Sequence, residues 1–419
     1  MYLRKVNYLM EKGLFHPMAP DTKTQEKYSD LYYNELRNNI LPFWYNKSGD
    51  HEHGGYFTCL TREGDVFDTD KFIWLQGRQV WTFSTMYRVL DQKEEWKNFA
   101  LQGAKFLQKH GRDQDGNWFF SLQRDGKPLT QAHNIFSDCF AAMGFSALHA
   151  ISPNHEYEKI AADTFGNIIS RQHDWKGRFS KTYPGTRPMK NFTLPMILCN
   201  LALEMEHILG KARVDALIPE VVDQVMNIFY RPEHGLIVEN VSADNSLVDS
   251  FEGRILNPGH AIEAMWFIMD IGKRTGNMSL IKEAKKIMLN TLEYAWDHEH
   301  GGLFYFMDLY QKPMQQLEWD QKLWWVHVET LVALAKGFSY TGDQECMNWF
   351  DKVHTYTWEK FRDPQHGEWF GYLHRDGLPL NTAKGGKWKG CFHIPRGLLM
   401  VAKAFEASNN NLSQISSIA

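Results

Sequence analysis

The sequence has little cysteine, and its cysteines are not arranged for a metal or a disulfide framework. Five occur in 419 residues, at Cys59, Cys139, Cys199, Cys346 and Cys391, and no two of them form a C-x-x-C pair. An odd number without close pairs argues against a structural zinc site and against a disulfide scaffold. We therefore expect a protein of a reducing compartment, the cytoplasm.

Long apolar runs and a surplus of positive charge are also missing. No stretch is apolar and uninterrupted enough to span a bilayer, and the first twenty residues lack the apolar centre of a signal peptide. The net charge is −4, so we expect neither nucleic acid nor an anionic membrane surface as a partner. Aromatic residues, in contrast, are abundant, with 15 Trp, 17 Tyr and 27 Phe, which is more ring surface than a core requires.

A repeated turn organises the chain. The hexapeptide Asp-His-Glu-His-Gly-Gly occurs at 50–55 and again at 297–302. Related turns recur at intervals of about 60 residues, anchored by Gly54, Gly116, Gly177, Gly235, Gly301 and Gly367. Three of these units continue into a second turn, at 61–65, 123–129 and 374–380. Each unit predicts a short, locally paired hairpin, because glycine and Asp-Gly provide the turn conformations that other residues resist.

Two kinds of helix alternate between the hairpins. Amphipathic, charged helices are predicted at 22–41, 92–110, 155–172, 211–229, 278–296 and 342–361. Helices that are apolar nearly all round are predicted at 72–90, 134–150, 191–209, 259–274, 323–340 and 391–407. Six such pairs predict a closed all-α ring, an (α/α)6 barrel or toroid with short β-hairpins on one rim. We expect one barrel domain over 22–407, an N-terminal extension over 1–21 and a polar, frayed tail over 408–419.

Polar residues mark the starts of four inner helices, and these starts should share one rim with the hairpins. They are Arg78, His260 with Glu263, His327 with Glu329, and Cys391 with His393 and Arg396. Trp74 and Arg78 are four residues apart, as are Trp325 and Glu329, so each pair places an aromatic ring one turn from a charge. That arrangement suits a sugar. Glu263 could orient the imidazole of His260, and we expect Glu329, rather than His327, to face the cavity.

Each of these residues also has a structural interpretation. A histidine on an apolar helix can be a satisfied core residue, Arg78 could neutralise Glu329, and the tryptophans could fill the core. The His-x-His of the repeated hexapeptide could bind a metal, but a repeated turn explains it without one. Cys391 next to His393 could form a thiolate nucleophile, which we do not favour. The segment GGKWKG at 385–390 lacks the spacing of a phosphate-binding loop.

Two histidines across a cavity suit the removal and return of a proton next to a carbonyl. Imidazole titrates at a pKa of about 6.5, so acid and base forms coexist near neutral pH. Arg78 could stabilise the enolate oxygen, and this chemistry requires neither a metal nor an organic cofactor. Glycoside hydrolysis would instead need two carboxylates about 5–10 Å apart. Glu263 and Glu329 are the pair available for it, and Asp138 is the comparable aspartate.

Several segments resemble the N-acylglucosamine 2-epimerase family, whose animal members are also called renin-binding protein. They are QGRQVW (76–81), NPGHAIEA (257–264), KLWWVHVET (322–330), GEWFGYL (367–373) and KGGKWKGCFHIPR (384–396). The resemblance extends from about residue 25 to 407, and the last segment is closer to the N-acylglucosamine branch than to the cellobiose branch. It implies an (α/α)6 barrel, commonly a homodimer, that interconverts N-acetylglucosamine and N-acetylmannosamine in amino-sugar or sialic acid metabolism.

The same resemblance implies roles for individual residues. It assigns His260 and His393 as the pair that exchanges the C2 proton after ring opening, with Arg78 and Glu329 as further catalytic residues. Expected substrate-binding residues are Trp74, Trp325, Glu263, His327, Trp369 and Arg396. Weak candidates for ring opening are His133 and His173. Some family members need ATP as an activator that is not consumed, and an ATP requirement stays open here. Alternatives are an aldose–ketose isomerase or neutral-sugar epimerase, an (α/α)6 glycoside hydrolase, and a non-catalytic protein-binding module.

Overall fold

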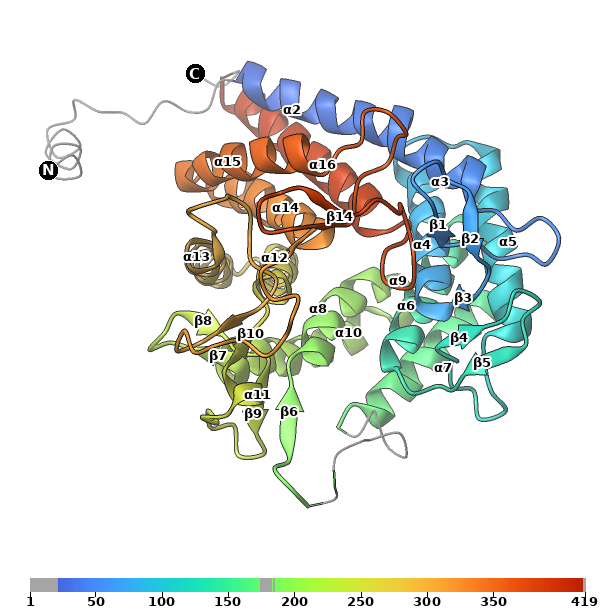
Figure 1. Ribbon diagram of the computed structural model, residues 1–419, viewed down its shortest axis with the longest axis horizontal. Coiled ribbons are helices and arrows are strands. Elements are labelled where there is room, and N and C mark those ends of the chain that lie inside the picture. The colour runs from blue at the N-terminus through green and yellow to red at the C-terminus, as the bar shows by residue number, and fades with distance from the viewer. Residues whose placement is uncertain (1–21, 174–182, 184, 417–419) are drawn as a thin grey trace, which may run out of the picture.

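The helices form a closed ring of two concentric layers, as the computed structural model shows for residues 22–173, 183 and 185–416 (Figure 1). The inner layer consists of α4 (Ile73–Val89), α6 (Ile135–Ile151), α8 (Thr193–Glu204), α12 (Pro258–Thr275), α14 (Trp324–Thr341) and α16 (His393–Ser416). The outer layer consists of α2 (Thr22–Glu35), α5 (Glu94–His110), α7 (His155–Arg171), α10 (Lys211–Asp223), α13 (Met278–Ala295) and α15 (Gln344–Lys360). The predicted (α/α)6 barrel is confirmed.

Short elements extend or connect these helices. The first outer helix continues through a π-turn, η1 (Leu36–Ile40), into α3 (Leu41–Lys47), and α10 continues into η3 (Gln224–Phe229). The remaining short helices are α9 (Glu206–Leu209) and α11 (Phe251–Arg254). Helix α16 runs to Ser416, past the residue 407 at which we expected the barrel to end. Within the described ranges, no helix combines the length and apolarity needed to cross a membrane.

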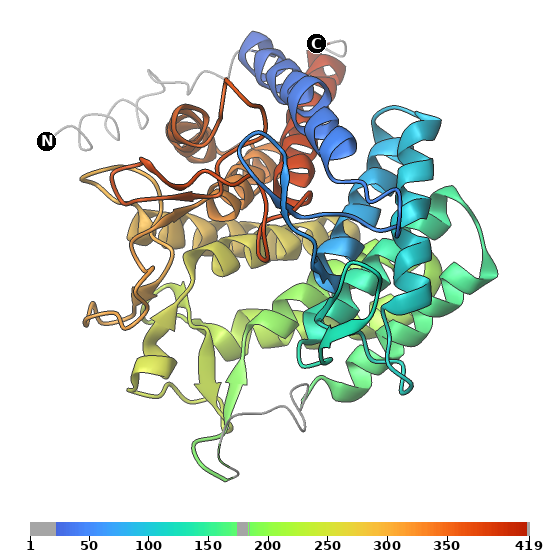
Figure 2. The same ribbon diagram turned by 45° about the vertical axis from the view of Figure 1, so that its right-hand side comes forward.

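The ring closes where the last helix meets the first. Helix α16 lies beside α2, and the two are adjacent in both views (Figures 1 and 2). Ser29 Oγ donates a hydrogen bond of 3.1 Å to the carbonyl of Ala402, and Tyr33 Oη donates one of 3.0 Å to Glu406. Because the first and last units pack against each other, neither presents an open apolar face that a capping repeat would have to cover.

Close packing of the inner helices depends on glycine at one crossing. A Cβ atom on Gly77 of α4 would lie 2.4 Å from the carbonyl oxygen of Phe140 in α6, which no side chain can tolerate. The missing side chain lets the two helix backbones approach. As a consequence, the next residue, Arg78, lies against the ring of Phe140, with its Cζ atom 3.9 Å from the ring centroid.

The strands pair between neighbouring units as well as within them, so the prediction of purely local hairpins was incomplete. Within units, β1 (Cys59–Leu60) pairs with β2 (Val66–Asp68), β4 (Ser121–Leu122) with β5 (Pro128–Thr130), β7 (Tyr230–Arg231) with β8 (Leu236–Ile237), and β13 (Tyr372–Leu373) with β14 (Pro379–Asn381). Between units, β3 (Lys71–Phe72) pairs with β4, β6 (Met189–Asn191) with β9 (Asn240–Ser242), β10 (Ile255–Leu256) with β11 (Met307–Asp308), and β12 (Lys322–Leu323) with β13. The strand before an inner helix therefore joins the hairpin of the next unit.

Three ion clusters, which we call the rim clusters, connect neighbouring units at the same places, each with a buried aspartate, a buried lysine and a partly exposed arginine. They are Asp50–Lys71–Arg124, Asp297–Lys322–Arg375 and Asp363–Lys384–Arg62. In each, the aspartate follows an outer helix, the lysine precedes the inner helix of the same unit, and the arginine comes from the next hairpin. The lysine Nζ lies 2.8–3.0 Å from a carboxylate oxygen. The third cluster joins the last unit to the first.

The rim clusters explain the repeated hexapeptide. Its aspartates, Asp50 and Asp297, are buried, and each accepts hydrogen bonds from backbone N–H groups of its own turn. Although burial alone would favour the protonated form, hydrogen bonds from the neighbouring arginine and lysine hold the pKa of both carboxyl groups well below the usual range. The motif thus supplies a structural ion pair at equivalent places in the ring.

Candidate active site

A cavity of about 530 Å³ lies at the hairpin rim, where the inner helices begin. Each of the six inner helices, or the residue just before it, contributes to its wall. Of the residues that the sequence singled out, the lining includes Trp74, Arg78, His260, Glu263, Trp325 and His393. These come from α4, α12, α14 and α16, so the ring brings together residues more than 300 positions apart.

His260 is held at the start of α12 by its local sequence, Asn-Pro-Gly-His. The Asn257 side chain caps the helix by accepting the backbone N–H of His260 at 3.2 Å, and Pro258 suits the first helical position. Gly259 leaves room for a ring, since a Cβ atom there would lie 2.6 Å from Trp325. The Nδ1 atom of His260 lies 3.1 Å from both carboxylate oxygens of Glu239.

His393 is the first residue of α16 and has a carboxylate partner of its own. Its Nδ1 atom lies 2.7 Å from Glu329 Oε1. The Trp325 ring is close to both imidazoles, with centroid distances of 5.3 Å to His260 and 5.8 Å to His393. In the part of the chain that the structure describes, neither Nε2 atom has a hydrogen-bond partner. If Nδ1 donates to its carboxylate, Nε2 of each ring is left to exchange a proton with a bound molecule.

The two imidazoles differ in proton affinity. Burial opposes the charged form of both rings. For His260, the charge and hydrogen bond of Glu239 outweigh burial, and the pKa is raised. For His393, burial and the positive charge of Arg78 lower the pKa well below the usual value. A proton shared by the two rings is therefore held by His260, and His393 favours the neutral imidazole.

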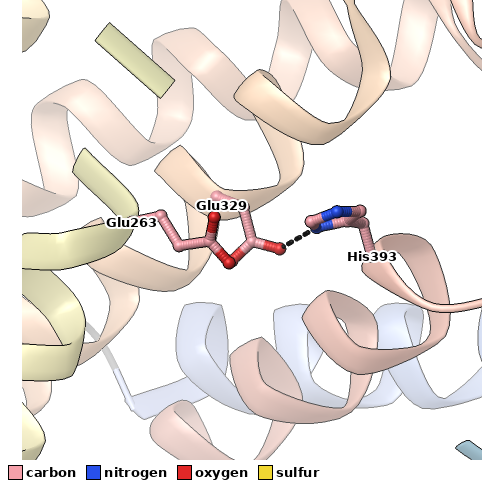
Figure 3. A group of neighbouring side chains, drawn as sticks. All are labelled: Glu263, Glu329 and His393. Carbon is pink, nitrogen blue, oxygen red and sulfur yellow. Dashed lines mark hydrogen bonds and ion pairs between the residues drawn. The ribbon is translucent and has the colours of Figure 1, made fainter. Parts of the chain in front are cut away.

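Glu263, Glu329 and Arg396 form a buried group next to His393, which we call the carboxylate cluster. Arg396 Nη2 donates to one oxygen of Glu263 and, at 2.7 Å, to Glu329 Oε1. The second oxygen of Glu329 accepts the indole N–H of Trp266 at 3.0 Å. Figure 3 shows Glu263 and Glu329 with their carboxylates facing each other and His393 bonded to Glu329.

The two glutamates of this cluster and the adjacent His393 together form a candidate metal site. Ligand atoms of Glu263, Glu329 and His393 all lie within 4.8 Å of one another. However, Arg396 already donates to both carboxylates, so a divalent cation would have to displace or approach a guanidinium. The donor set is therefore better matched to arginine than to a metal.

Arg78 is buried but has no anionic partner of its own among the residues that the structure describes. Its Cζ atom lies 4.5, 3.9 and 4.7 Å from the ring centroids of Trp74, Phe140 and Phe392. Within the described residues its Nε atom has no hydrogen-bond acceptor and its guanidinium forms no ion pair. Burial and the charge of Arg396 lower its pKa to about 9, so it stays charged at neutral pH. A caged cation without a partner is suited to an oxygen that carries negative charge.

The structure corrects two expected pairings. Glu263 does not orient His260, because its carboxylate is bonded to Arg396 and the partner of His260 is Glu239. Arg78 does not neutralise Glu329, since Arg396 has that role. Glu329 is fully buried behind the cavity wall, so it does not face the cavity as expected and contacts His393 instead.

Three expected binding residues lie outside the cavity lining: Arg396, which is buried in the carboxylate cluster, His327 and Trp369. His327 is fully buried, accepts the backbone N–H of Leu303 at Nε2 and stacks on Tyr356 at 5.3 Å. Burial lowers its pKa to about 3, as for a neutral core histidine. Trp369 is also fully buried, and its indole N–H donates to Glu35 at 2.8 Å. Neither His327 nor Trp369 reaches a bound sugar without rearrangement of the fold.

The weaker candidates are likewise placed elsewhere. Burial raises the pKa of the Cys391 thiol well above its usual value, which opposes a thiolate nucleophile. Asp138 pairs with Arg171 of the neighbouring outer helix at 2.5 Å. His133 and His173 are exposed and absent from the cavity lining.

The structure adds lining residues that sequence reasoning missed. They are Asn134, Phe136, Phe140, Thr193, Met196, Ile197, Tyr305, Glu318, Gln321, Leu323, Trp324, Tyr372 and Trp388. Trp388 was visible within the segment GGKWKG, five residues before His393, and could have been chosen in place of Trp369. Glu239 contacts His260 from outside the lining, and no motif in the neighbouring sequence identifies it as a site residue.

Two lysines of the segment around Trp388 are not available to a nucleoside triphosphate. Lys384 Nζ lies 2.8 Å from Asp363, and Lys389 Nζ lies 2.7 Å from Glu368, so both ammonium groups are already paired and buried. A Cβ atom on Gly385 would lie 2.1 Å from the carbonyl oxygen of Thr58. This glycine allows close packing of the loop against the first hairpin, and of the three lysines in this segment only Lys387 is exposed.

Comparison with known proteins identifies the family. A family model described as N-acylglucosamine 2-epimerase (GlcNAc 2-epimerase) matches residues 55–395. The chain belongs to the N-acylglucosamine 2-epimerase family. Curated N-acylglucosamine 2-epimerases of Bos taurus and Homo sapiens are 37% and 36% identical to it, covering 95% and 93% of both chains. The protein is therefore an epimerase, an enzyme of the isomerase class.

More distant relatives are similar in sequence or in fold. A cellobiose 2-epimerase of Bacteroides fragilis is 27% identical, with 86% of this chain and 95% of that protein covered. The solved structure of a cellobiose 2-epimerase from Bacillus thermoamylovorans superposes with a TM-score of 0.79 at 21% identity. That match covers 90% of this chain and 99% of the other and supports the (α/α)6 barrel.

Proposed function

We propose that this N-acylglucosamine 2-epimerase family member interconverts N-acetylglucosamine and N-acetylmannosamine with His260 and His393 as its acid/base pair. One observation carries the proposal. Two histidines from different inner helices lie at one cavity, each with Nδ1 on a carboxylate and Nε2 without a partner among the described residues. Inversion at C2 requires a base on one face of that carbon and an acid on the other.

We assign the first step from the relative proton affinities of the two histidines, since His260 binds a proton more strongly than His393. In the open-chain aldose, Nε2 of neutral His393 takes the C2 proton, and the C–H electrons form the C1–C2 double bond of an enolate. The carbonyl π electrons move to the C1 oxygen, where the negative charge collects. The His260 imidazolium then delivers its Nε2 proton to the opposite face of C2 while the C1 carbonyl forms again. In the reverse direction the two histidines exchange roles, and proton exchange with solvent restores the resting state.

Arg78 stabilises the enolate in this scheme. A guanidinium that is caged by three rings and has no ion-pair partner in the described part of the chain has no competing ion pair to give up when the oxygen becomes charged. Glu329, bonded to His393 Nδ1, keeps that proton on Nδ1 so that Nε2 is the basic nitrogen. Arg396 donates to both Glu263 and Glu329 and offsets part of their negative charge. We propose chemistry without a metal or an organic cofactor, and no step passes through ATP.

The cavity wall supports an N-acyl sugar as substrate. Phe140, Met196 and Ile197 give one part of the wall an apolar surface that suits an acyl methyl group, while Glu318 and Gln321 line another part with polar groups. Trp74 and Trp325 supply ring faces for the C–H faces of the sugar. A glycoside hydrolase is disfavoured, because Glu329 is outside the lining and cannot flank a glycosidic bond together with Glu263.

Proton NMR in D₂O tests the proposal. N-acetylmannosamine is incubated with the enzyme, with and without ATP, and the C2 proton signals of both epimers are followed. We expect N-acetylglucosamine that carries deuterium at C2 in both samples. Product that retains all of its C2 protium would contradict two solvent-exchanging histidines, and parallel incubations with glucose, mannose and cellobiose would reveal a neutral-sugar enzyme.

A further inference from the structure

We infer that Glu239 is a positioning residue that holds His260 in the imidazolium form and thereby makes the two histidines unequal. The effect of Glu239 on catalysis rests on the proposed function. Its structural part, a charge pair between Glu239 and His260, stands on geometry alone, since both carboxylate oxygens lie 3.1 Å from Nδ1.

The backbone fixes Glu239 between two structural elements of the rim. Its N–H donates to the carbonyl of Ile255 at 3.1 Å, and its carbonyl accepts the N–H of Phe192 at 2.9 Å. Ile255 precedes α12, which carries His260, and Phe192 precedes α8. Because both backbone groups are bonded and the residue is only 8% exposed, the carboxylate has little freedom to leave the imidazole.

Glu239 and Glu329 occupy equivalent places relative to their histidines but differ in charge balance. Glu329 shares its carboxylate with Arg396, so part of its charge is neutralised before it meets His393. Within the described ranges, Glu239 has no ion-pair partner except His260. The charge of Glu239 is therefore available in full to a proton on His260.

Other ionisable groups near His260 do not account for this difference. Glu263 on the same helix favours the imidazolium, but its carboxylate is paired with Arg396. His393, on α16, faces His260 across the cavity and, when charged, would disfavour a second positive charge. Tyr305 lies close enough to Glu239 to feel its charge, and burial raises the pKa of its phenol above the usual value, so it stays neutral. Glu239 is thus the group that decides the charge of His260.

The variant E239Q separates charge from shape. Glutamine can still accept the Nδ1 proton, so the ring keeps its orientation while the negative charge is lost. In the wild-type enzyme, kcat/KM should decline at high pH when His260 loses its proton. Without the carboxylate that raises its pKa, His260 should lose the proton at lower pH. We expect the alkaline limb of kcat/KM to move to lower pH in both reaction directions, with a loss of about 10-fold or more above pH 8.

Two further variants serve as controls. E239D keeps the charge and should keep the position of the alkaline limb, even if its rate is lower. E233Q makes the same chemical change at an exposed residue of the same hairpin and should leave the profile unchanged. A uniform fall of kcat/KM at every pH in E239Q, with an unmoved alkaline limb, would show a merely structural role and overturn the inference.

A second measurement does not depend on turnover. Carbon NMR of the full chain labelled at histidine Cε1, with the His260 signal identified by its loss in H260N, follows the imidazole titration directly. We expect that titration to move to lower pH in E239Q and to stay in E239D and E233Q. An unchanged His260 titration in E239Q would refute the charge pair. If the wild-type enzyme epimerises no N-acyl hexosamine, the proposed function fails, whereas this titration still decides the role of Glu239.

Discussion

The rim clusters and the cavity both contain buried acidic and basic side chains, but the two regions differ in how completely these side chains are paired. In a rim cluster such as Asp297–Lys322–Arg375, one carboxylate meets two cations, and all three are satisfied within the protein. In the cavity, Arg78 is buried without an anion and two imidazoles have a free Nε2 among the described residues. Repetition marks the first set as part of the scaffold, while incomplete pairing marks the second as prepared for a substrate.

The contrast also corrects an easy misinterpretation of the sequence. The hexapeptide that occurs twice is the most conspicuous motif of the chain, with two histidines and two acidic residues in six positions. Its aspartates belong to the rim clusters, which connect neighbouring units of the ring. Hydrogen bonds and charges from Lys71 and Lys322 help to keep these aspartates ionised. Arg78, His260 and His393, in contrast, do not belong to a repeated motif. In a closed repeat fold, unrepeated polar residues at inner-helix starts are therefore better candidates for catalysis than repeated ones.

The largest effect should come from the histidines themselves. We expect His393→Asn, and separately His260→Asn, to lower kcat by at least about 1,000-fold, because each removes a proton-transfer group that no neighbour replaces. Thermal unfolding should change little, since asparagine keeps a polar group at the cavity. His298→Asn, in the exposed turn of the second hexapeptide, is the matched control and should keep full activity. Substantial turnover by His393→Asn would end its assignment as acid/base.

A substitution of Arg78 tests whether a buried charge without an ion pair among the described residues contributes to catalysis and lowers stability. We expect Arg78→Met to lower kcat by about 100-fold to 1,000-fold, because the enolate loses its cation. The same change should not destabilise the fold, and it should raise the free energy of unfolding by about 1 kcal/mol, since it removes a buried charge that has no partner. Parallel measurements of kcat and of the denaturant midpoint check both parts. A destabilised variant with unaltered kcat would make Arg78 a scaffold residue.

The third rim cluster should show the opposite behaviour. Asp363→Asn leaves buried Lys384 without its carboxylate, so we expect a loss of about 3 kcal/mol in unfolding free energy. At 25 °C, kcat of the folded fraction should stay within about twofold, because no residue of this cluster lines the cavity.

The double variant D363N/K384M supplies the control for that change. It removes both buried charges, and it should regain much of the stability, since the penalty in the single variant comes from the uncompensated lysine. If Asp363→Asn instead lowers kcat and leaves the denaturant midpoint in place, the division between scaffold charges and catalytic charges fails.

The sequence was sufficient for the architecture because the repeat appears in local patterns. Turn glycines and helix periodicity located both helical layers, and the helix-face rule correctly placed Arg78 beside Trp74, with 4.5 Å between the guanidinium Cζ and the ring centroid. The same rule was less successful for Trp325 and Glu329. They share one side of α14, but Glu329 lies one turn deeper, where α12 and α16 cover it.

Contacts that depend on the closed ring were not accessible from sequence. Arg396 meets Glu263 across two inner helices that are 133 residues apart in the chain. Glu239 reaches His260 only after the strands that flank it have paired and fixed its backbone. In GEWFGYL, Trp369 points to the outer helix and bonds Glu35, whereas Tyr372 lines the cavity. Side-chain direction in an irregular hairpin cannot be read from residue type.

The smallest effect should appear at the cavity mouth, between the scaffold and the catalytic residues. Trp388 lines the cavity, is half exposed, and packs edge-on against Trp74 with 5.5 Å between ring centroids. Because its ring lies outside the caged part of the site, we expect Trp388→Ala to raise KM about fivefold, which corresponds to ~1 kcal/mol of binding, with kcat nearly unchanged. Phe67→Ala, at an exposed aromatic residue away from the cavity, should leave both constants unchanged. A large fall in kcat for Trp388→Ala would instead place this tryptophan among the groups that orient the reacting carbon. The catalytic centre would then extend to the mouth of the cavity.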